Sequence, residues 1–375
     1  MIRFLTSGES HGKCLVALVD GFPSGVKIDP AKIQRFLDRR RSPYGRSKRM
    51  TVEKEQFEIT SGLEGDITTG APITIIIETV DYRRGKKSSW MVPRPGHADL
   101  PGMLKYRKED VYPIAERASA RETAVRVAAG ALTHILLEAF DISVLGHVIE
   151  IGGERIDYPA EYPADMRKIV ESSPLYTLDP KACEKMKKKI DEITEAGDTI
   201  GGVFEIIAEG VPPGLGSYVQ WDRKIDGKLA MAIMAVNAVK AVEIGEGIAS
   251  SKEPGTLVHD EIYHDSARGG YYRQTARNGG TEGGMTNGTP LIVRGFVKPI
   301  PTIKKALKSV DVKTKQEKQP TYRRSDYCVV APASVVGEAM VSWVLAAEMV
   351  EKFGGDSLSD MRASYEDYMK WVREC

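Results

Sequence analysis

"SARETAVRVAAGALTHILLEAF", residues 119–140, is the stretch that decides the fold class of this chain. Ser119 and Glu122 have the spacing of a capping box, and the largely apolar residues behind them predict a long helix. A second stretch of this kind, "APASVVGEAMVSWVLAAEMVEKFGG" at residues 331–355, predicts another long and largely buried helix. The chain is therefore expected to contain at least two long core helices.

Shorter helices and strands surround these two stretches. In residues 29–41, Asp29 can cap a helix that Pro30 opens, and residues 179–198 repeat this arrangement. Five short β-branched segments bounded by Gly or Pro read as strands: residues 13–21, 71–79, 141–153, 201–210 and 289–297. Because strands and helices do not alternate regularly, we predict an α+β fold with antiparallel sheets rather than a doubly wound parallel sheet.

The composition is that of an ordinary globular protein, with 42% hydrophobic and 28% charged residues. No linker rich in Pro and Ser divides the chain, so we expect one domain over residues 1–375. The four cysteines are scattered, which suggests neither a disulfide framework nor a zinc site. The N-terminus has no apolar signal region, and runs such as "ITIIIE" and "VLAAEMV" are too short to span a bilayer. These features predict a cytoplasmic protein without a membrane partner.

A cluster of basic residues lies within "RFLDRRRSPYGRSKR", residues 35–49, where Asp38 is the one acid. Such a cluster predicts an anionic ligand, which could be a nucleic-acid backbone, a membrane surface or a small, highly charged metabolite. The whole chain balances 53 basic against 52 acidic residues, and this near-neutrality argues against general capture of nucleic acid.

Two histidines lie in loops framed by glycine or proline. His11 follows Ser10 in "SGESHG", where it is either a proton donor with Ser10 as its relay or a loop histidine with a satisfied hydrogen bond. His97 in "RPGHADLPG" is either a functional histidine kept protonated by a nearby anion or part of a simple turn. The positions of His134 and His147 indicate core or edge residues, and no histidine has the spacing of a metal site.

A helix start can also bind an anion. Arg117 precedes the cap Ser119, and Arg121 lies in the first turn, where the helix dipole disfavours arginine unless an anion is bound. The alternative is that these arginines pair with a neighbouring carboxylate. Near the C-terminus, "YRRSDYC" places Arg324 beside Asp326, which indicates either a positioned base or a surface ion pair. The glycine-rich residues 268–290 contain neither of the common nucleotide fingerprints.

Six blocks in sequence resemble chorismate synthase. "GESHGKCLVALVDGFPSG", "RASARETAVRVAAGA" and "RSDYCVVAPASVVGEAM" are similar to its N-terminal, central and C-terminal signatures. "RPGHADL", "NAVKAVEIGEG" and "EGGMTNGTP" resemble further family blocks and occur in the expected order. The resemblance therefore extends over nearly the whole chain.

The resemblance implies a carbon–oxygen lyase of the shikimate pathway, the last common step of aromatic amino acid biosynthesis. It would convert 5-enolpyruvylshikimate 3-phosphate to chorismate and phosphate by an anti-1,4-elimination. The family reaction involves no net redox change but requires reduced FMN (FMNH2), which donates an electron transiently while phosphate departs and recovers it when the C6 hydrogen is removed. The substrate and FMN are both polyanions. Burying them together is costly unless arginines converge on them, so the basic cluster is expected to line a small pocket.

The resemblance also implies roles for individual residues. His11 would protonate the leaving phosphate, His97 would protonate or hold the flavin, and Ser10 and Asp326 would manage the proton at flavin N5. The residues implied to bind substrate are Arg40, Arg46 and Arg121. The residues implied to bind FMN are Arg117, Ala118, Ser119, Asn237, Ala238, Gly283, Lys298, Pro299, Ile300, Pro301, Thr302 and Arg324. Ala118 stands where serine is common in the family, and "RSPYGR" replaces the more usual "RPGxxR".

Family members usually form homotetramers around a β-α-β sandwich, with long central helices between mainly antiparallel sheets. Some reduce their flavin with a nicotinamide cofactor (NADP), but without a dinucleotide fingerprint we expect an external flavin reductase or other reductant here. One rival is a phosphate- or RNA-binding protein, which would bind polynucleotides in a strongly salt-dependent way. Another is a flavin oxidoreductase that uses the same FMN site for hydride transfer.

Overall fold

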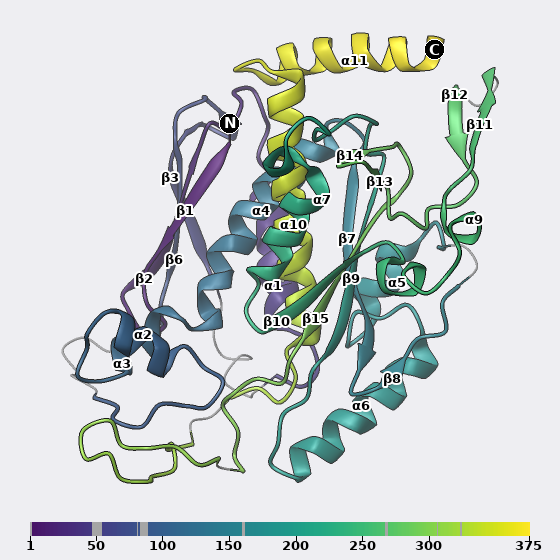
Figure 1. Cartoon of the computed structure of the whole chain (residues 1–375). Coiled ribbons are helices and arrows are strands. Elements are labelled where there is room, and N and C mark those ends of the chain that lie inside the picture. The colour runs from purple at the N-terminus through teal and green to yellow at the C-terminus, as the bar shows by residue number, and fades with distance from the viewer. Residues whose placement is uncertain are drawn as a thin grey trace.

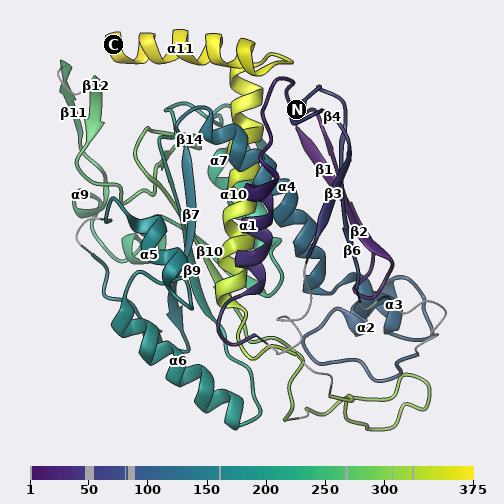
Figure 2. The ribbon, with the colours of Figure 1, turned by 180° about the vertical axis from the view of Figure 1, so that it is seen from behind.

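Two antiparallel sheets lie on either side of a layer of long helices in the computed structural model of the chain (Figure 1). The structure describes residues 2–46, 55–80, 82, 89–159, 162–266, 269–305, 307–322 and 325–375. The helices of this layer are α1 (Pro30–Arg41), α4 (Thr123–Glu138) and α10 (Val330–Phe353). The view from behind shows the same order of layers (Figure 2). The predicted α+β class with antiparallel sheets is therefore confirmed.

The first sheet buries one face against the helices. Its strands, in spatial order, are β1 (Arg3–Ser7), β2 (Cys14–Asp20), β6 (Ile73–Glu78) and β3 (Phe57–Ser61). All neighbouring strands are antiparallel. Alternate residues of the two central strands, including Leu15, Ala17, Ile75 and Ile77, are fully buried, because side chains alternate between the faces of a sheet.

The second sheet packs on the other side of the helices. Its strands, in spatial order, are β10 (Val239–Ile244), β15 (Leu291–Val297), β9 (Gly202–Glu209), β7 (Ser143–Ile151) and β8 (Glu154–Arg155). These pairs are also antiparallel. Helix α10 packs on β7 and β9, whereas α4 packs on β2 and β6 of the first sheet.

Two glycines allow the layers to approach closely. A Cβ atom at Gly130 of α4 would lie 2.4 Å from the Cβ of Ala339 in α10, so the two helices touch through their backbones here. A Cβ atom at Gly146 of β7 would lie 2.4 Å from the carbonyl oxygen of Ser334. Such distances are shorter than van der Waals contact allows, so a larger residue at either site would push α10 away from its neighbour.

Helix α10 contains the run "VLAAEMV", which by itself is too short to cross a bilayer, but the whole helix is longer than this run. Judged by length and composition alone, the 24 residues of α10 are long and apolar enough to cross a bilayer. However, 94% of its most apolar window is buried inside the protein, as expected for the central helix of a core.

The remaining elements are shorter or lie at the periphery. The other helices are α2 (Asp99–Lys105), α3 (Tyr112–Arg117), η2 (Ala120–Glu122), α5 (Met166–Ser172), α6 (Pro180–Glu195), η3 (Trp221–Arg223), α7 (Ile225–Met234), α8 (Gly247–Ser250), α9 (Gly255–Val258) and α11 (Leu358–Glu374). Three two-stranded pairs are β4 (Leu63–Glu64) with β5 (Ile67–Thr68), β11 (Ile262–Asp265) with β12 (Gly270–Arg273), and β13 (Thr281–Glu282) with β14 (Met285–Thr286). Figure 1 shows α11 crossing the end of the layers opposite α2 and α3.

The predicted cap signals at Asp29 and Asp179 are confirmed, since each side chain accepts hydrogen bonds from the first turn of its helix. The five predicted strands are also present. The helix predicted to begin at Ser119 begins with a 3₁₀ turn, and its α-helical part starts at Thr123. Ser119 caps this turn by accepting a hydrogen bond from the backbone of Arg121.

Candidate active site

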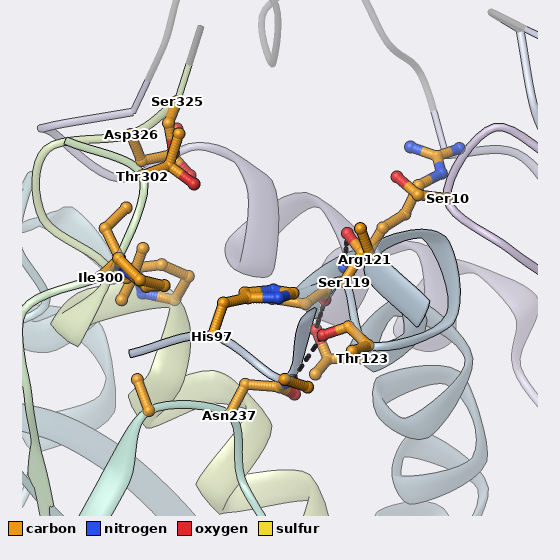
Figure 3. A pocket seen from close by; sticks show the side chains of 18 of the residues that line it. Ser10, His97, Ser119, Arg121, Thr123, Asn237, Ile300, Thr302, Ser325 and Asp326 are labelled. Carbon is orange, nitrogen blue, oxygen red and sulfur yellow. Dashed lines mark hydrogen bonds between the residues drawn. The ribbon is translucent and has the colours of Figure 1, made fainter. Parts of the chain in front are cut away.

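A cavity of about 770 Å³ opens beside the layer of helices, and this volume suits a small-molecule ligand. Its walls come from segments far apart in the chain: the β1–β2 loop, the end of α1, the segment from residue 94 to 98, the α3–η2 junction, the α7–β10 connection, the residues after β15, and the start of α10. Figure 3 shows His97, Asn237, Arg121 and Asp326 around the hollow.

Three arginines of the predicted substrate site line this cavity: Arg40, Arg46 and Arg121. Arg40 and Arg121 share the carboxylate of Glu55, which is 1% exposed. Arg40 bonds it directly through Nη2, whereas Nη1 of Arg121 lies 4.0 Å from Glu55 Oε1. The guanidinium of Arg46 donates to Asp326 Oδ2 at 2.7 Å. Among the described residues, three guanidiniums thus meet two carboxylates, an arrangement that favours an anionic ligand.

Arg39 belongs to the same basic run but has a different environment. Its guanidinium makes two hydrogen bonds to Glu338 of α10, of 3.0 and 2.8 Å, in a pair that is almost entirely buried. Burial alone would raise the pKa of Glu338, but the charge of Arg39 and its hydrogen bonds lower it. Arg39 therefore ties α1 to α10, and the described lining of the cavity does not include it.

The structure brings both predicted loop histidines to the cavity, each with a buried carboxylate. Nδ1 of His11 lies 3.0 and 3.1 Å from the two carboxylate oxygens of Glu116. Nδ1 of His97 lies 2.5 Å from Oδ1 of Asp99. A carboxylate at Nδ1 fixes the orientation of an imidazole ring and favours a proton on that nitrogen.

Asp99 joins His97 to Arg94. The Arg94 side chain donates to both carboxylate oxygens, at 2.8 and 3.0 Å, and its Nη1 donates to Thr302 at 3.2 Å. Burial alone would raise the pKa of Asp99, but hydrogen bonds from His97 and Arg94 outweigh it and hold this pKa well below its usual range. Asp99 is therefore a permanent anion beside His97.

Most of the predicted flavin contacts also line the cavity: Ala118, Ser119, Asn237, Ala238, Lys298, Ile300, Pro301 and Thr302. Nδ2 of Asn237 donates weakly to the Ala118 carbonyl, at 3.5 Å. Its Oδ1 is buried and accepts no hydrogen bond from any described residue. Ala238 has a φ of +70°, a left-handed conformation that an L-residue adopts at a cost. Ser10 and Asp326 lie on opposite sides of the hollow in Figure 3.

Three other predicted contacts lie outside the described lining of the cavity. Arg117 donates to the carbonyl oxygens of Thr6 and Gly8, at 3.0 and 3.2 Å. Gly283 lies between β13 and β14, and Pro299 is absent from the described lining although its neighbours Lys298 and Ile300 belong to it. Arg324 lies outside the described residues. The assigned roles of these four residues, like those of the eight that line the cavity, remain predictions.

The two histidines interpreted as core or edge residues, His134 and His147, are both buried and so belong to the core. His134 packs edge-on against Phe36, and burial lowers its pKa to about 4. His147 lies 3.0 Å from Glu205, which also accepts a hydrogen bond from Arg294. Burial alone would raise the pKa of Glu205, but His147 and Arg294 lower it to about 2.

Sequence reasoning missed three carboxylates of the site. Glu55, Glu116 and Asp99 each contact a predicted functional side chain, yet none was assigned to the site. Asp99 lies inside the quoted "RPGHADL" block and Glu116 directly precedes Arg117, so their proximity to predicted residues was the available signal. Glu55 follows the basic run by several residues and carried no signal of its own.

A sequence model of a known family, described as chorismate synthase, matches residues 2–350. The chain belongs to the chorismate synthase family. A chorismate synthase of Geobacter sulfurreducens is 48% identical over 391 residues, covering 100% of both chains. One of Carboxydothermus hydrogenoformans is 47% identical and covers 99% of both. A crystal structure of a chorismate synthase aligns with a TM-score of 0.84 at 38% identity, covering 100% of this chain and 99% of the other. The chain is therefore an enzyme of this family.

Proposed function

We propose that this enzyme converts 5-enolpyruvylshikimate 3-phosphate to chorismate and phosphate by an anti-1,4-elimination that requires reduced FMN. The observation that carries the proposal is the convergence of Arg40, Arg46 and Arg121 on one cavity in a chain that matches the family over its full length. The reaction would be the last common step of aromatic amino acid biosynthesis in the shikimate pathway.

The charges of the cavity suit such a substrate. The substrate carries two carboxylates and a phosphate. Such groups leave water readily only where cationic donors take the place of the water. Each charge-assisted hydrogen bond to an arginine contributes about 1.5–3 kcal/mol. Arg40 and Arg121 are held by Glu55, and Arg46 by Asp326, so their positions are set before substrate arrives.

The residues present also fit FMN. Apolar side chains of the lining, such as Val236, Ile300 and Pro301, suit the faces of a flat ring system. The buried Oδ1 of Asn237 could accept a hydrogen bond from a ring N–H, which would satisfy an otherwise costly polar atom. We propose that Ser119 and Lys298 join them, with Arg117, Gly283, Pro299 and Arg324 completing the flavin contacts. When bound, reduced FMN supplies transient electron donation to the substrate.

The remaining residues would handle protons. We propose that His11 protonates the departing phosphate and that His97 holds or protonates the reduced flavin. Their carboxylate partners, Glu116 and Asp99, support these roles because they orient each ring. Ser10 and Asp326 would manage the proton at flavin N5 from opposite sides of the cavity.

The wider setting follows from the family resemblance. We propose one domain over the chain, a β-α-β sandwich core, a homotetramer, a cytoplasmic location and an external source of reduced flavin. NADPH consumption by the purified protein under air would instead identify a flavin reductase activity of its own.

Phosphate release under anaerobic conditions tests the function directly. The purified protein is mixed with 5-enolpyruvylshikimate 3-phosphate, with and without dithionite-reduced FMN. We expect phosphate and chorismate in equal amounts, and only when reduced FMN is present. Absence of product with reduced FMN, or equal product without it, would overturn the proposal. Salt-sensitive binding of polynucleotides in place of turnover would favour the RNA-binding rival.

A further inference from the structure

One residue, Glu116, holds both ends of the Ser10–His11 dipeptide. Its backbone carbonyl oxygen accepts a hydrogen bond from the Ser10 N–H at 3.1 Å. Its carboxylate accepts another from the His11 N–H at 2.8 Å and lies 3.0 and 3.1 Å from His11 Nδ1. The backbone and the ring of the candidate proton donor therefore share a single acceptor.

The surroundings make these contacts strong. Glu116 is 5% exposed, and the side chain of His11 is 14% exposed, so water competes little for either group. Residues 8–13 between β1 and β2 form no helix or strand. The position of His11 in this loop consequently depends on hydrogen bonds to other segments, among which those to Glu116 are prominent.

The location of Glu116 adds a second constraint. It is the penultimate residue of α3, and Arg117, Ala118 and Ser119 follow it directly in the chain. The same turn therefore carries the carboxylate that holds His11 and the residues assigned to the flavin. Movement of this turn would shift His11 and the residues assigned to the flavin together, and would preserve the distance between them.

We propose that Glu116 is the positioning residue for His11. By engaging Nδ1, its carboxylate fixes the ring orientation and keeps a proton on that nitrogen. When the ring carries a second proton on Nε2, that proton is the one transferred to the leaving phosphate, and the ring returns to the neutral form with its proton on Nδ1. Glu116 itself touches neither substrate nor flavin in this proposal. The inference rests on the proposed role of His11 in the elimination.

A double-mutant cycle tests the proposal kinetically. Glu116→Gln keeps the shape of the side chain but loses its charge, and we expect kcat to fall about 10- to 100-fold, as for other residues that orient a reacting group. In a His11→Ala background the same change should have almost no further effect, because its target is gone. Equal losses in both backgrounds would show that Glu116 acts on the fold instead, and would overturn the proposal.

Glu138 offers a matched control. Its carboxylate lies 3.5 Å from Nε2 of His134, and the described lining of the cavity does not include it. Glu138→Gln therefore removes a similar pair elsewhere, and its kcat should stay at the wild-type value. If Glu116→Gln does not fold, Glu116→Asp replaces it. The shorter carboxylate should lower kcat less than the loss of His11, again only when His11 is present.

A spectroscopic measurement separates this inference from the proposed function. Long-range ¹H–¹⁵N spectra of ¹⁵N-histidine-labelled protein report which ring nitrogen carries the proton, and His11→Ala assigns the signal among the six histidines. We expect a proton on Nδ1 of His11 and a changed pattern for this residue alone in Glu116→Gln. An unchanged His11 signal would overturn the positioning role even if the elimination activity were confirmed. The spectrum remains informative if that activity is absent.

Discussion

Arg39→Met should destabilise the fold while leaving the chemistry intact. The change removes both hydrogen bonds to Glu338 and leaves a carboxylate that is fully buried between α1 and α10. Breaking a buried ion pair from one side costs about 3–5 kcal/mol. Glu338 keeps a hydrogen bond from the Gly146 N–H at 2.9 Å, and Arg167 lies 3.5 Å away. We therefore expect the lower end, a loss of about 3 kcal/mol.

The double variant Arg39→Met/Glu338→Leu tests whether the unpaired Glu338 carboxylate causes the loss of stability. Replacing both charges with apolar side chains removes the uncompensated carboxylate, and such replacements are often neutral. The Gly146 N–H then loses its acceptor, at a cost of about 1–3 kcal/mol. The double variant should therefore be no less stable than Arg39→Met, and the expected outcome is a partial recovery.

Urea unfolding at neutral pH and one fixed protein concentration, followed by tryptophan fluorescence, measures the free energy of unfolding. Arg3→Met serves as the control, because Arg3 pairs with Asp20 at the surface, where the two side chains are 75% and 44% exposed. This variant should be less than about 1 kcal/mol below the wild type in stability. Wild-type stability in Arg39→Met would refute the reasoning. So would a raised KM for the substrate in the folded variant, since that would place Arg39 in the site.

Three further outcomes are expected. Arg46→Ala should raise the substrate KM about 10- to 100-fold, the equivalent of one lost charge-assisted hydrogen bond; an unchanged KM in steady-state assays would place this arginine outside the substrate site. His97→Ala should lower kcat by about 10²-fold with the fold intact by circular dichroism, and near-normal turnover would remove its role. The pKa of Glu205 is depressed in the folded protein, so its ionised side chain stabilises the fold above pH 4.5. This stabilisation is lost as pH falls toward 2. Urea titrations should thus show a loss on the order of 3 kcal/mol that is missing in Glu205→Gln.

Much of the fold follows from local signals in the sequence. Asp29 and Asp179 cap their helices through contacts within a few residues, so a short window contains the whole cause. The strands β1, β3 and β10 were not predicted, although all three are present. They are edge or near-edge segments whose pairing depends on partners elsewhere in the chain, and their own patterns are weak.

The sequence predicted the residue types of the site but not which side chains face the cavity. The basic run indicated an anion site, but Arg39 and Arg40 are neighbours on α1 that point in different directions. Which one faces the cavity depends on Glu338, 299 residues away, and on Glu55, which the family blocks do not include. Contacts over such distances leave no local trace, so sequence patterns alone could not assign them.

The position of α10 in the chain has a consequence for how the protein is made. This helix packs on α4 and on β7 and β9, yet it ends at Phe353 of 375 residues. A growing chain therefore exposes the face of the second sheet that α10 covers until α10 itself has been made. Contacts of such long sequence separation form slowly, and nascent chains in this condition are prone to aggregate. The apolar residues of β7 and β9 are thus the surface through which such association would occur before α10 covers them.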